Sequence, residues 1–290
     1  MKELIKKIIP LKGITLARCM KSYRSNGRKD MIIKGFNKFF SESWIYPKGT
    51  NDEEAYIYQL SLICRKIEIN DNQYFFYPFS SKIHRFIRPN VMNILSITPA
   101  YEYVVNTDFT EENNEVIKAL KVLLERVQNK QSKNSRFLEI KRLCPNLLKL
   151  SESFEQALQK ILFFHGLLWQ MGHGHNGLGR LDMVLYPYYK NDIENGILDK
   201  VKAEEILREA IAIIGANTHD KSATLYGDTG QYILLGGIDK NGNNVENDLT
   251  FMFLEIFSTL SVPDPKLILR VNKNTSKDVY DSAAKVMVLH

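Results

Sequence analysis

Cysteine is scarce in this sequence. The 290 residues include three cysteines, Cys19, Cys64 and Cys144, which are widely separated and odd in number. This spacing matches neither a disulfide framework nor a zinc site. Few cysteines without pairing are typical of a protein from a reducing compartment. We therefore expect a cytoplasmic protein that is stabilised by its core rather than by cross-links.

Long apolar runs are missing as well. Lysines interrupt the apolar residues of positions 1–21 every few residues. This segment therefore lacks the continuous apolar core of a signal peptide. No run elsewhere approaches the length of a membrane span, so we expect no association with a membrane.

The charge is not concentrated in one arm. A net charge of +6 is modest for 290 residues, and the basic residues are spread along the chain without a nucleic-acid-binding motif. We expect a solvated basic surface and no nucleic-acid partner. A hydrophobic content of 44% with 25% charged residues is ordinary for a globular protein with a substantial core.

The C-terminal part alternates strand and helix patterns. Gln231–Gly237 is a short apolar run, and a helical pattern opens near Asn247 and stops at a Pro-Asp-Pro sequence. Leu267–Val271 form a second apolar run, and Thr275 with Asp278 predicts a capping box for another helix. This alternation predicts parallel strands joined by right-handed crossovers, which is an α/β fold.

The chain upstream is predicted to be rich in helices. Residues 153–156 read as a capping box before a long helix that is apolar on all sides, and such a helix is normally buried. A second capping box is expected at residues 108–111. Further helices are predicted around 53–65, 137–144 and 202–214.

Two groups of short motifs resemble a known family. The first group comprises Gly230-Gln231, Leu235-Gly236-Gly237-Ile238-Asp239, Asn247-Asp248-Leu249-Thr250 and Pro263-Asp264-Pro265; the second comprises Gly179-Arg180-Leu181-Asp182, Tyr186-Pro187-Tyr188-Tyr189 and Asp192. In this order they resemble the pyruvate formate-lyase branch of the glycyl radical enzymes. The resemblance is good over residues 134–290 and weak over the first 70.

The resemblance implies a fold and a division of the chain. Residues 101–290 would form the N-terminal part of a pyruvate formate-lyase-like α/β barrel, with parallel strands and outer helices. Residues 1–100 are expected to be an irregular mixed region. In the family, a cysteine loop and a glycine loop follow the segment that matches Asn272–Leu289. Neither the catalytic cysteine nor the radical glycine can be assigned here, and Cys144 matches a non-catalytic cysteine.

The resemblance also implies a chemistry and partners. Family members cleave C–C or C–O bonds with a glycyl radical that a radical-SAM activase installs. We expect no cofactor bound by this chain itself. The implied substrate is a small polar molecule such as a 2-oxo acid or a diol. The implied partners are the activase, the missing C-terminal half and a second copy in a homodimer. The chain alone is expected to be inactive.

Five residues are candidates for the substrate cavity. His175 and Asn176 align, with one deletion, with a Gly-His-Ser-type segment that faces the cavity in dehydratase-like members. Asp228, Thr229 and Gln231 would line the cavity at a strand end, or form a turn. We interpret Arg180 and Asp182 as a structural ion pair at a strand entrance.

Three alternatives remain at this stage. Gly172–Gly177 matches G-x-G-x-x-G, but a capped helix precedes it where dinucleotide binding requires a strand. His173 and His175 form an H-x-H pair that would suit a zinc-dependent hydrolase, although no further ligand spacing is recognisable. Finally, the chain would be a catalytically silent binding or assembly remnant of the barrel.

Overall fold

The computed structural model describes residues 52–79, 96–111, 113–171, 175–218, 231–262 and 264–289. The helices are α4 (Asp52–Lys66), α6 (Tyr101–Val105), α7 (Glu115–Asn129), α8 (Ser135–Leu143), α9 (Phe154–Gln170), α10 (Leu181–Glu194), α11 (Lys200–Thr218), α12 (Asp248–Phe257) and α13 (Lys277–Leu289). The strands are β1 (Ser96–Ile97), β2 (His175–Asn176), β3 (Tyr232–Gly236) and β4 (Lys266–Arg270). Helix α8 ends at Leu143, close to the predicted end at residue 144. A short 3₁₀ turn over Cys144–Asn146, which contains Pro145, follows it.

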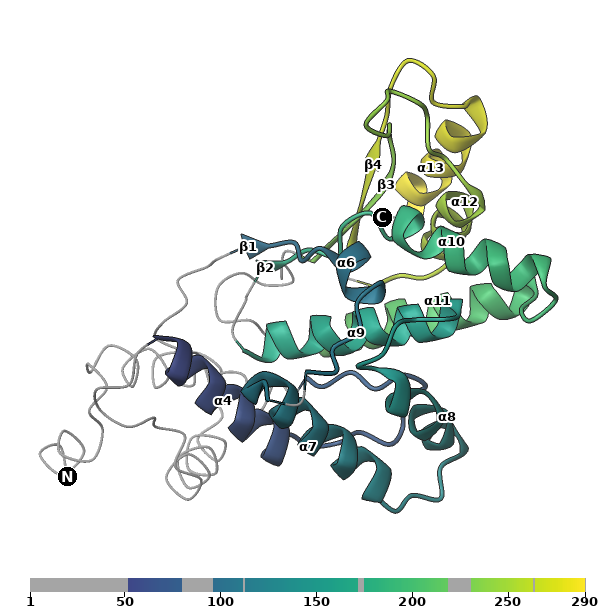
Figure 1. The fold of residues 1–290 in the computed structure, drawn as a ribbon. Coiled ribbons are helices and arrows are strands. Elements are labelled where there is room, and N and C mark those ends of the chain that lie inside the picture. The colour runs from purple at the N-terminus through teal and green to yellow at the C-terminus, as the bar shows by residue number, and fades with distance from the viewer. Residues whose placement is uncertain are drawn as a thin grey trace, which may run out of the picture.

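Helix α9 is the central element, and it separates two hydrophobic cores. Its residues Leu158 and Ile161 pack into the core formed with α10, α11 and α12, while Phe163 and Leu167 pack into the core formed with α4, α7 and α8. Figure 1 shows α10 and α12 on one side of α9 and α4, α7 and α8 on the other. The all-round apolar pattern of this helix therefore has a structural cause: both of its sides are buried.

The four strands form one parallel array. Strand β1 pairs with β2, and β3 pairs with β4, in both cases in parallel. The segment that contains β2 continues to Gly179, which bridges Ile233 of β3. The spatial order is therefore β1, β2 with its extension, β3 and β4, which is also the order in the chain. The predicted parallel arrangement of the last two strands is confirmed.

Helices cover one face of the β3–β4 pair. Ile233 and Leu235 of β3 are fully buried in the core that α10 and α12 share, whereas Tyr232 and Leu234 are only partly buried. In β4, Leu267 and Leu269 pack against that same core. Figure 1 shows α10, α12 and α13 together on one side of the two strands. Side chains that alternate along a strand point to opposite faces, so the second face carries Tyr232 and Leu234.

Helix starts were predicted with mixed success. The predicted helix start near Asn247 is confirmed, and a capping box forms there, because the side chains of Asn247 and Thr250 each bond the backbone of the other residue. The box at 108–111 is wrong: α7 begins at Glu115, and Asn114 caps it by accepting from Val116 and Ile117. At α13, the side chain of Ser276 rather than Thr275 accepts from the first helical turn.

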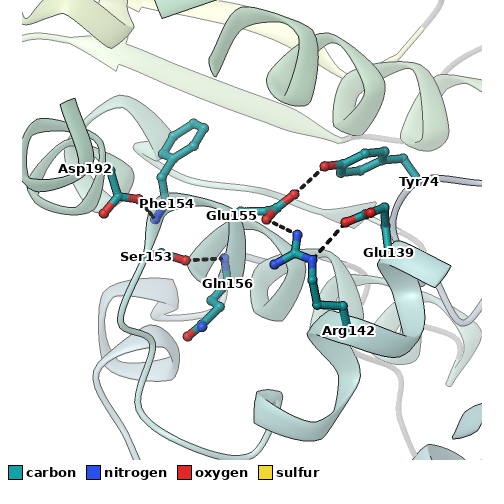
Figure 2. Close-up of polar contacts among 8 residues, drawn as sticks. All are labelled: Tyr74, Glu139, Arg142, Ser153, Phe154, Glu155, Gln156 and Asp192. Atoms are coloured by element: carbon teal, nitrogen blue, oxygen red, sulfur yellow. Dashed lines mark hydrogen bonds and ion pairs between the residues drawn. The ribbon is translucent and has the colours of Figure 1, made fainter. Parts of the chain in front are cut away.

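The start of α9 has only half of its predicted box. The Ser153 hydroxyl accepts from the backbone N–H of Gln156 at 3.3 Å, but the side-chain oxygen of Gln156 accepts from the backbone N–H of Glu152 instead of that of Ser153. A buried carboxylate from α10 completes the cap, because Asp192 accepts from the N–H of Phe154 at 2.8 Å. Figure 2 shows both contacts at this helix end. Anions at a helix N-terminus are stabilised by its unpaired N–H groups.

The same helix end is linked to its neighbours by charge. Glu155 accepts hydrogen bonds from Tyr74 and from Arg142, and Arg142 also donates to Glu139 of α8 at 2.8 Å (Figure 2). This network joins α8 to α9.

None of the helices in the described ranges combines the length and the apolar character that a membrane crossing requires.

A candidate functional site at the start of strand β3

His165 of α9 lies at the centre of a buried polar network. Its Nε2 lies 2.7 Å from the side-chain oxygen of Gln231, and its Nδ1 lies 3.0 Å from the hydroxyl of Tyr101 in α6. All three side chains are buried, His165 and Gln231 completely. The ring of Tyr77 also lies against the imidazole. The network therefore joins α6, α9 and the residue that precedes β3.

The partners of His165 determine its tautomer. The Gln231 oxygen can only accept, so Nε2 carries the proton and donates it, and Nδ1 accepts from the Tyr101 hydroxyl. Burial lowers the pKa of His165 to about 4, although the hydrogen bond to Gln231 opposes this effect. Burial also raises the pKa of Tyr101 well above its ordinary value. Both groups are therefore neutral at pH 7.

Asn176 joins the same network from β2. Its side-chain N–H₂ donates to the backbone carbonyl of His165 at 3.1 Å, and the side chain is fully buried. Its side-chain oxygen has no hydrogen-bond partner among the described residues. The structure thus brings together two of the five expected cavity residues, Asn176 and Gln231, around a histidine that links them. An unpartnered buried amide oxygen is an acceptor that a ligand or water can satisfy.

The other expected cavity residues are described less fully. The backbone of His175 belongs to β2, where it pairs with Ser96. Its side chain lies outside what the structure describes, as do Asp228, Thr229 and His173. The G-x-G-x-x-G segment follows helix α9 directly, and the next helix starts only at Leu181.

Arg180 and Asp182 do not form the expected ion pair. Instead, both bind Gly236 at the end of β3: Arg180 donates to its carbonyl at 2.8 Å, and Asp182 accepts from its N–H at 2.7 Å. Asp182 also accepts from the hydroxyl of Thr250 in α12 at 2.8 Å. The two residues lie at the start of α10 rather than at a strand entrance. Each side chain thus binds a backbone group of the same glycine. Burial lowers the pKa of Arg180 and raises that of Asp182, and the opposite charge of each residue opposes the shift of the other.

The two described cysteines are buried in the second core. Cys64 of α4 and Cys144 are both completely buried between helices of the second core. Burial raises the pKa of the Cys64 thiol to about 12 and also raises that of Cys144. Cys19 is outside the described residues.

Metal ligands do not gather in the described ranges. No three side chains of the histidine, cysteine, aspartate or glutamate type lie together there. A surface cleft of about 460 Å³ lies between α6 and α10. Of the expected site residues, only Arg180 is among those that line this cleft. The cleft is therefore distinct from the His165 network.

Sequence reasoning missed His165 and Tyr101. The available signal was the set of polar side chains within an otherwise apolar helix, namely Gln159, Lys160, His165 and Gln170, all buried in the structure. Gln159, for example, bonds both the N–H and the carbonyl of Phe76. A polar residue in a helix that is buried on all sides requires a specific partner, which the sequence does not identify.

The parallel array with its outer helices defines the chain as part of an α/β barrel. Among solved structures, it is similar to a glycyl radical enzyme from Archaeoglobus fulgidus, with a TM-score of 0.66 at 16% identity over 87% of this chain and 48% of that one. It is also similar to the B12-independent glycerol dehydratase from Clostridium butyricum, with a TM-score of 0.57 at 16% identity over 82% of this chain and 34% of that one. These similarities show the fold and confirm the predicted partial barrel.

Residues 98–289, about two thirds of the sequence, match the pyruvate formate lyase-like family, and the chain belongs to that family. It is 31% identical over 131 residues to (2S)-3-sulfopropanediol dehydratase from Klebsiella oxytoca, covering 43% of this chain and 16% of that protein. It is 27% identical over 146 residues to trans-4-hydroxy-L-proline dehydratase from Clostridioides difficile, covering 47% and 18%. The chain thus spans less than a fifth of these relatives. The resemblance to glycyl radical enzymes is confirmed.

Proposed function

We propose that this chain is the N-terminal part of a glycyl radical enzyme that cleaves a C–C or C–O bond of a small polar substrate. Residues 101–290 would supply scaffold and one wall of the cavity, and residues 1–100 would form an irregular mixed N-terminal region. The catalytic cysteine and the radical glycine would come from a C-terminal part, and a radical-SAM activase would install the radical. The chain alone would be inactive.

One observation carries this proposal: a buried neutral histidine links two expected cavity residues. The imidazole of His165 donates to the side-chain oxygen of Gln231, and the backbone carbonyl of His165 accepts from the side-chain N–H₂ of Asn176. Both side-chain amides therefore have fixed orientations. Fixed amide groups at a cavity wall can recognise a hydroxyl or carboxylate without reorganising during the reaction. We extend the wall to His175, Asp228 and Thr229, which adjoin these two residues in the sequence.

The chemistry of the relatives supports C–O cleavage over transfer of an acyl group. Two of the relatives are named as dehydratases, one acting on a sulfopropanediol and one on a hydroxyproline. A third relative is the glycyl radical subunit of a 4-hydroxyphenylacetate decarboxylase from Clostridioides difficile. We therefore expect a hydroxylated substrate.

A chimera tests the proposal. The segment of the Klebsiella oxytoca dehydratase that matches this chain is replaced by its counterpart from this chain. The product is then treated with the dehydratase's own activating system. We expect the electron paramagnetic resonance signal of a glycyl radical in the chimera and none in the isolated 290 residues.

Variants of the chimera test the cavity. Asn176→Ala should lower turnover without changing the radical yield, whereas Asn195→Ala, at the exposed end of α10, should leave both unchanged. A folded chimera without a radical, or equal effects of the two variants, contradicts the proposal.

A further inference from the structure

The surface cleft between α6 and α10 contains a buried hydroxyl without a partner. Ser151 lines this cleft and is only 7% exposed, yet its side-chain oxygen has no hydrogen-bond partner among the described residues. A buried polar group that lacks a partner destabilises a folded protein, so such groups are rare. A hydroxyl of this kind in the wall of a cleft indicates that the cleft receives a polar group from outside the chain.

Two carboxylates line the same cleft without a counter-charge. Within the described ranges, Glu102 accepts from Asn106 and Glu152 donates to Gln156 through backbone groups, but neither carboxylate forms a hydrogen bond or an ion pair. The chain as a whole carries a net charge of +6, so these unpaired carboxylates differ from its average surface. Carboxylates gathered in a cleft attract ions of the opposite charge.

Hydrogen bonds show which end of the cleft holds the orphan hydroxyl. The N–H of Ser151 donates to the carbonyl of Val105 at 3.1 Å, and the hydroxyl of Tyr188 donates to the side-chain oxygen of Asn106 at 2.9 Å. Both contacts lie at the C-terminal end of α6, and Tyr188 belongs to the C-terminal half of α10. Ser151 and its neighbour Glu152 therefore lie toward the C-terminal end of α10.

The rest of the cleft follows one stripe of α10. Met183, Val184 and Pro187 line it at helical spacing and present an apolar surface. Arg180 lies beyond this stripe, at the N-terminal end of α10, about 15 Å along the helix axis from Asn191 in the last turn. Its guanidinium donates to backbone carbonyls at and after the end of β3, at 2.8 and 3.1 Å. The cleft thus has an acidic end, an apolar surface and a positively charged end.

We propose that this cleft binds a small aliphatic primary amine as its ammonium ion. The ammonium group lies against Ser151 and the two glutamates, and the aliphatic chain lies along the apolar stripe of α10. An ammonium group has three donors and no acceptor, and the cleft offers one hydroxyl oxygen and two carboxylates as acceptors. A water molecule could satisfy the hydroxyl but would not neutralise the carboxylates.

The size and position of the cleft agree with this ligand. Its volume of about 460 Å³ is in the range in which proteins hold small molecules. Arg180 repels a cation from the far end, so the ligand has one favoured orientation. The site lies apart from the His165 network and does not depend on the proposed radical chemistry.

NMR titration of the 290-residue chain with n-butylamine at pH 7.5 tests the site. We expect saturable one-to-one binding with a Kd of about 1 mM, and amide shifts confined to the residues that line the cleft. 1-Butanol has the same chain without the charge, and butyrate has the opposite charge. Both should bind at least about tenfold more weakly than the amine.

Three variants locate the ammonium group. Ser151→Ala should weaken binding at least about threefold and leave the melting temperature unchanged or higher, because its hydroxyl has no partner to lose. Glu152→Gln keeps the shape of the side chain, removes its charge and should weaken binding at least about fivefold. The matched control is Glu125→Gln on α7, which is exposed, lies outside the cleft and should leave the affinity unchanged.

Four results overturn the proposal. They are the absence of saturable shifts with n-butylamine, equal binding of 1-butanol, full affinity in both cleft variants, and an equal loss of affinity in Glu125→Gln. A last probe separates a free amine from a lysine side chain. Nα-acetyl-lysine methylamide carries the same ammonium group on a peptide backbone, and tighter binding of this probe than of n-butylamine would assign the cleft to a partner protein instead.

Discussion

The buried His165 predicts a specific loss of stability in mild acid. Its pKa is about 4 in the folded protein, compared with an ordinary value of 6.5. Because the folded state disfavours the protonated imidazole, the neutral histidine contributes its full stabilisation above pH 6.5. That contribution is lost as the pH falls from 6.5 toward 4, where the unfolded chain binds a proton and the folded chain does not. The difference corresponds to about 3 kcal/mol, at 1.36 kcal/mol for each pH unit.

Urea unfolding between pH 7.5 and 4 measures this effect. Tryptophan fluorescence follows the unfolding; of the two tryptophans, Trp44 and Trp169, the ring of Trp169 is buried and stacks on Phe79 at 4.0 Å. At pH 7.5, His165→Gln should be less stable than the parent, because the Tyr101 hydroxyl and the Gln231 side-chain oxygen lose their hydrogen bonds to the imidazole. The gap should narrow by about 3 kcal/mol as the pH approaches 4.

A control keeps carboxylate effects apart from the histidine. Protonation of acidic groups lowers the stability of parent and variant alike, so only the difference between them reports on His165. Asn195→Gln, at the exposed end of α10, changes no titratable group and should follow the parent at every pH. Parallel curves for the parent and His165→Gln would refute the reasoning, as would an imidazole that titrates near 6.5 in the folded protein by NMR.

Three further predictions concern stability, each measured by urea unfolding at pH 7.5. Asp182→Ala should cost about 3–5 kcal/mol, because it leaves the N–H of Gly236 and the hydroxyl of Thr250 without an acceptor, whereas the exposed Asp281→Ala should change little; equal effects would contradict the buried clamp. Ser153→Ala should cost about 1 kcal/mol and Asp192→Ala about 2 kcal/mol, since the Asp192 acceptor is buried; the reverse order would show that Ser153 is the main cap of α9. Gly242→Ala should cost about 1 kcal/mol for its positive φ of 84°, and Gly237→Ala should cost more, because its new Cβ would lie 3.0 Å from the Cβ of Arg270; similar losses would exclude that contact.

The sequence predicts the elements of the C-terminal part well because their signals are local. The apolar runs, the Asn247–Thr250 box and the prolines before β4 each act within a few residues. The box expected at 108–111 failed for a local reason too: Asn114, closer to the apolar stripe of α7, supplies the cap. Helix boundaries were less accurate, as α11 extends over Lys200–Thr218 where residues 202–214 were expected.

The polar contacts of the candidate site could not be predicted in the same way. His165 meets Tyr101 across 64 residues of sequence and Gln231 across 66, and nothing local to any of the three indicates the pairing. Arg180 and Asp182 illustrate the same limit. Opposite charges two residues apart suggest an ion pair. At the start of α10, however, both side chains bind backbone groups of Gly236 in β3, which is 54 and 56 residues away in the sequence.

These long-range contacts share one structural role, which is to hold the two ends of β3. Asp182 and Arg180 hold the end of β3 at Gly236, and His165 holds its beginning at Gln231. Both ends of the strand are thus tied to helices by buried hydrogen bonds, while its middle is held by apolar packing of Ile233 and Leu235. A strand fixed at both ends keeps its register without the rest of a barrel around it. For this reason we expect the amides of β3 to be protected against hydrogen exchange in the isolated chain.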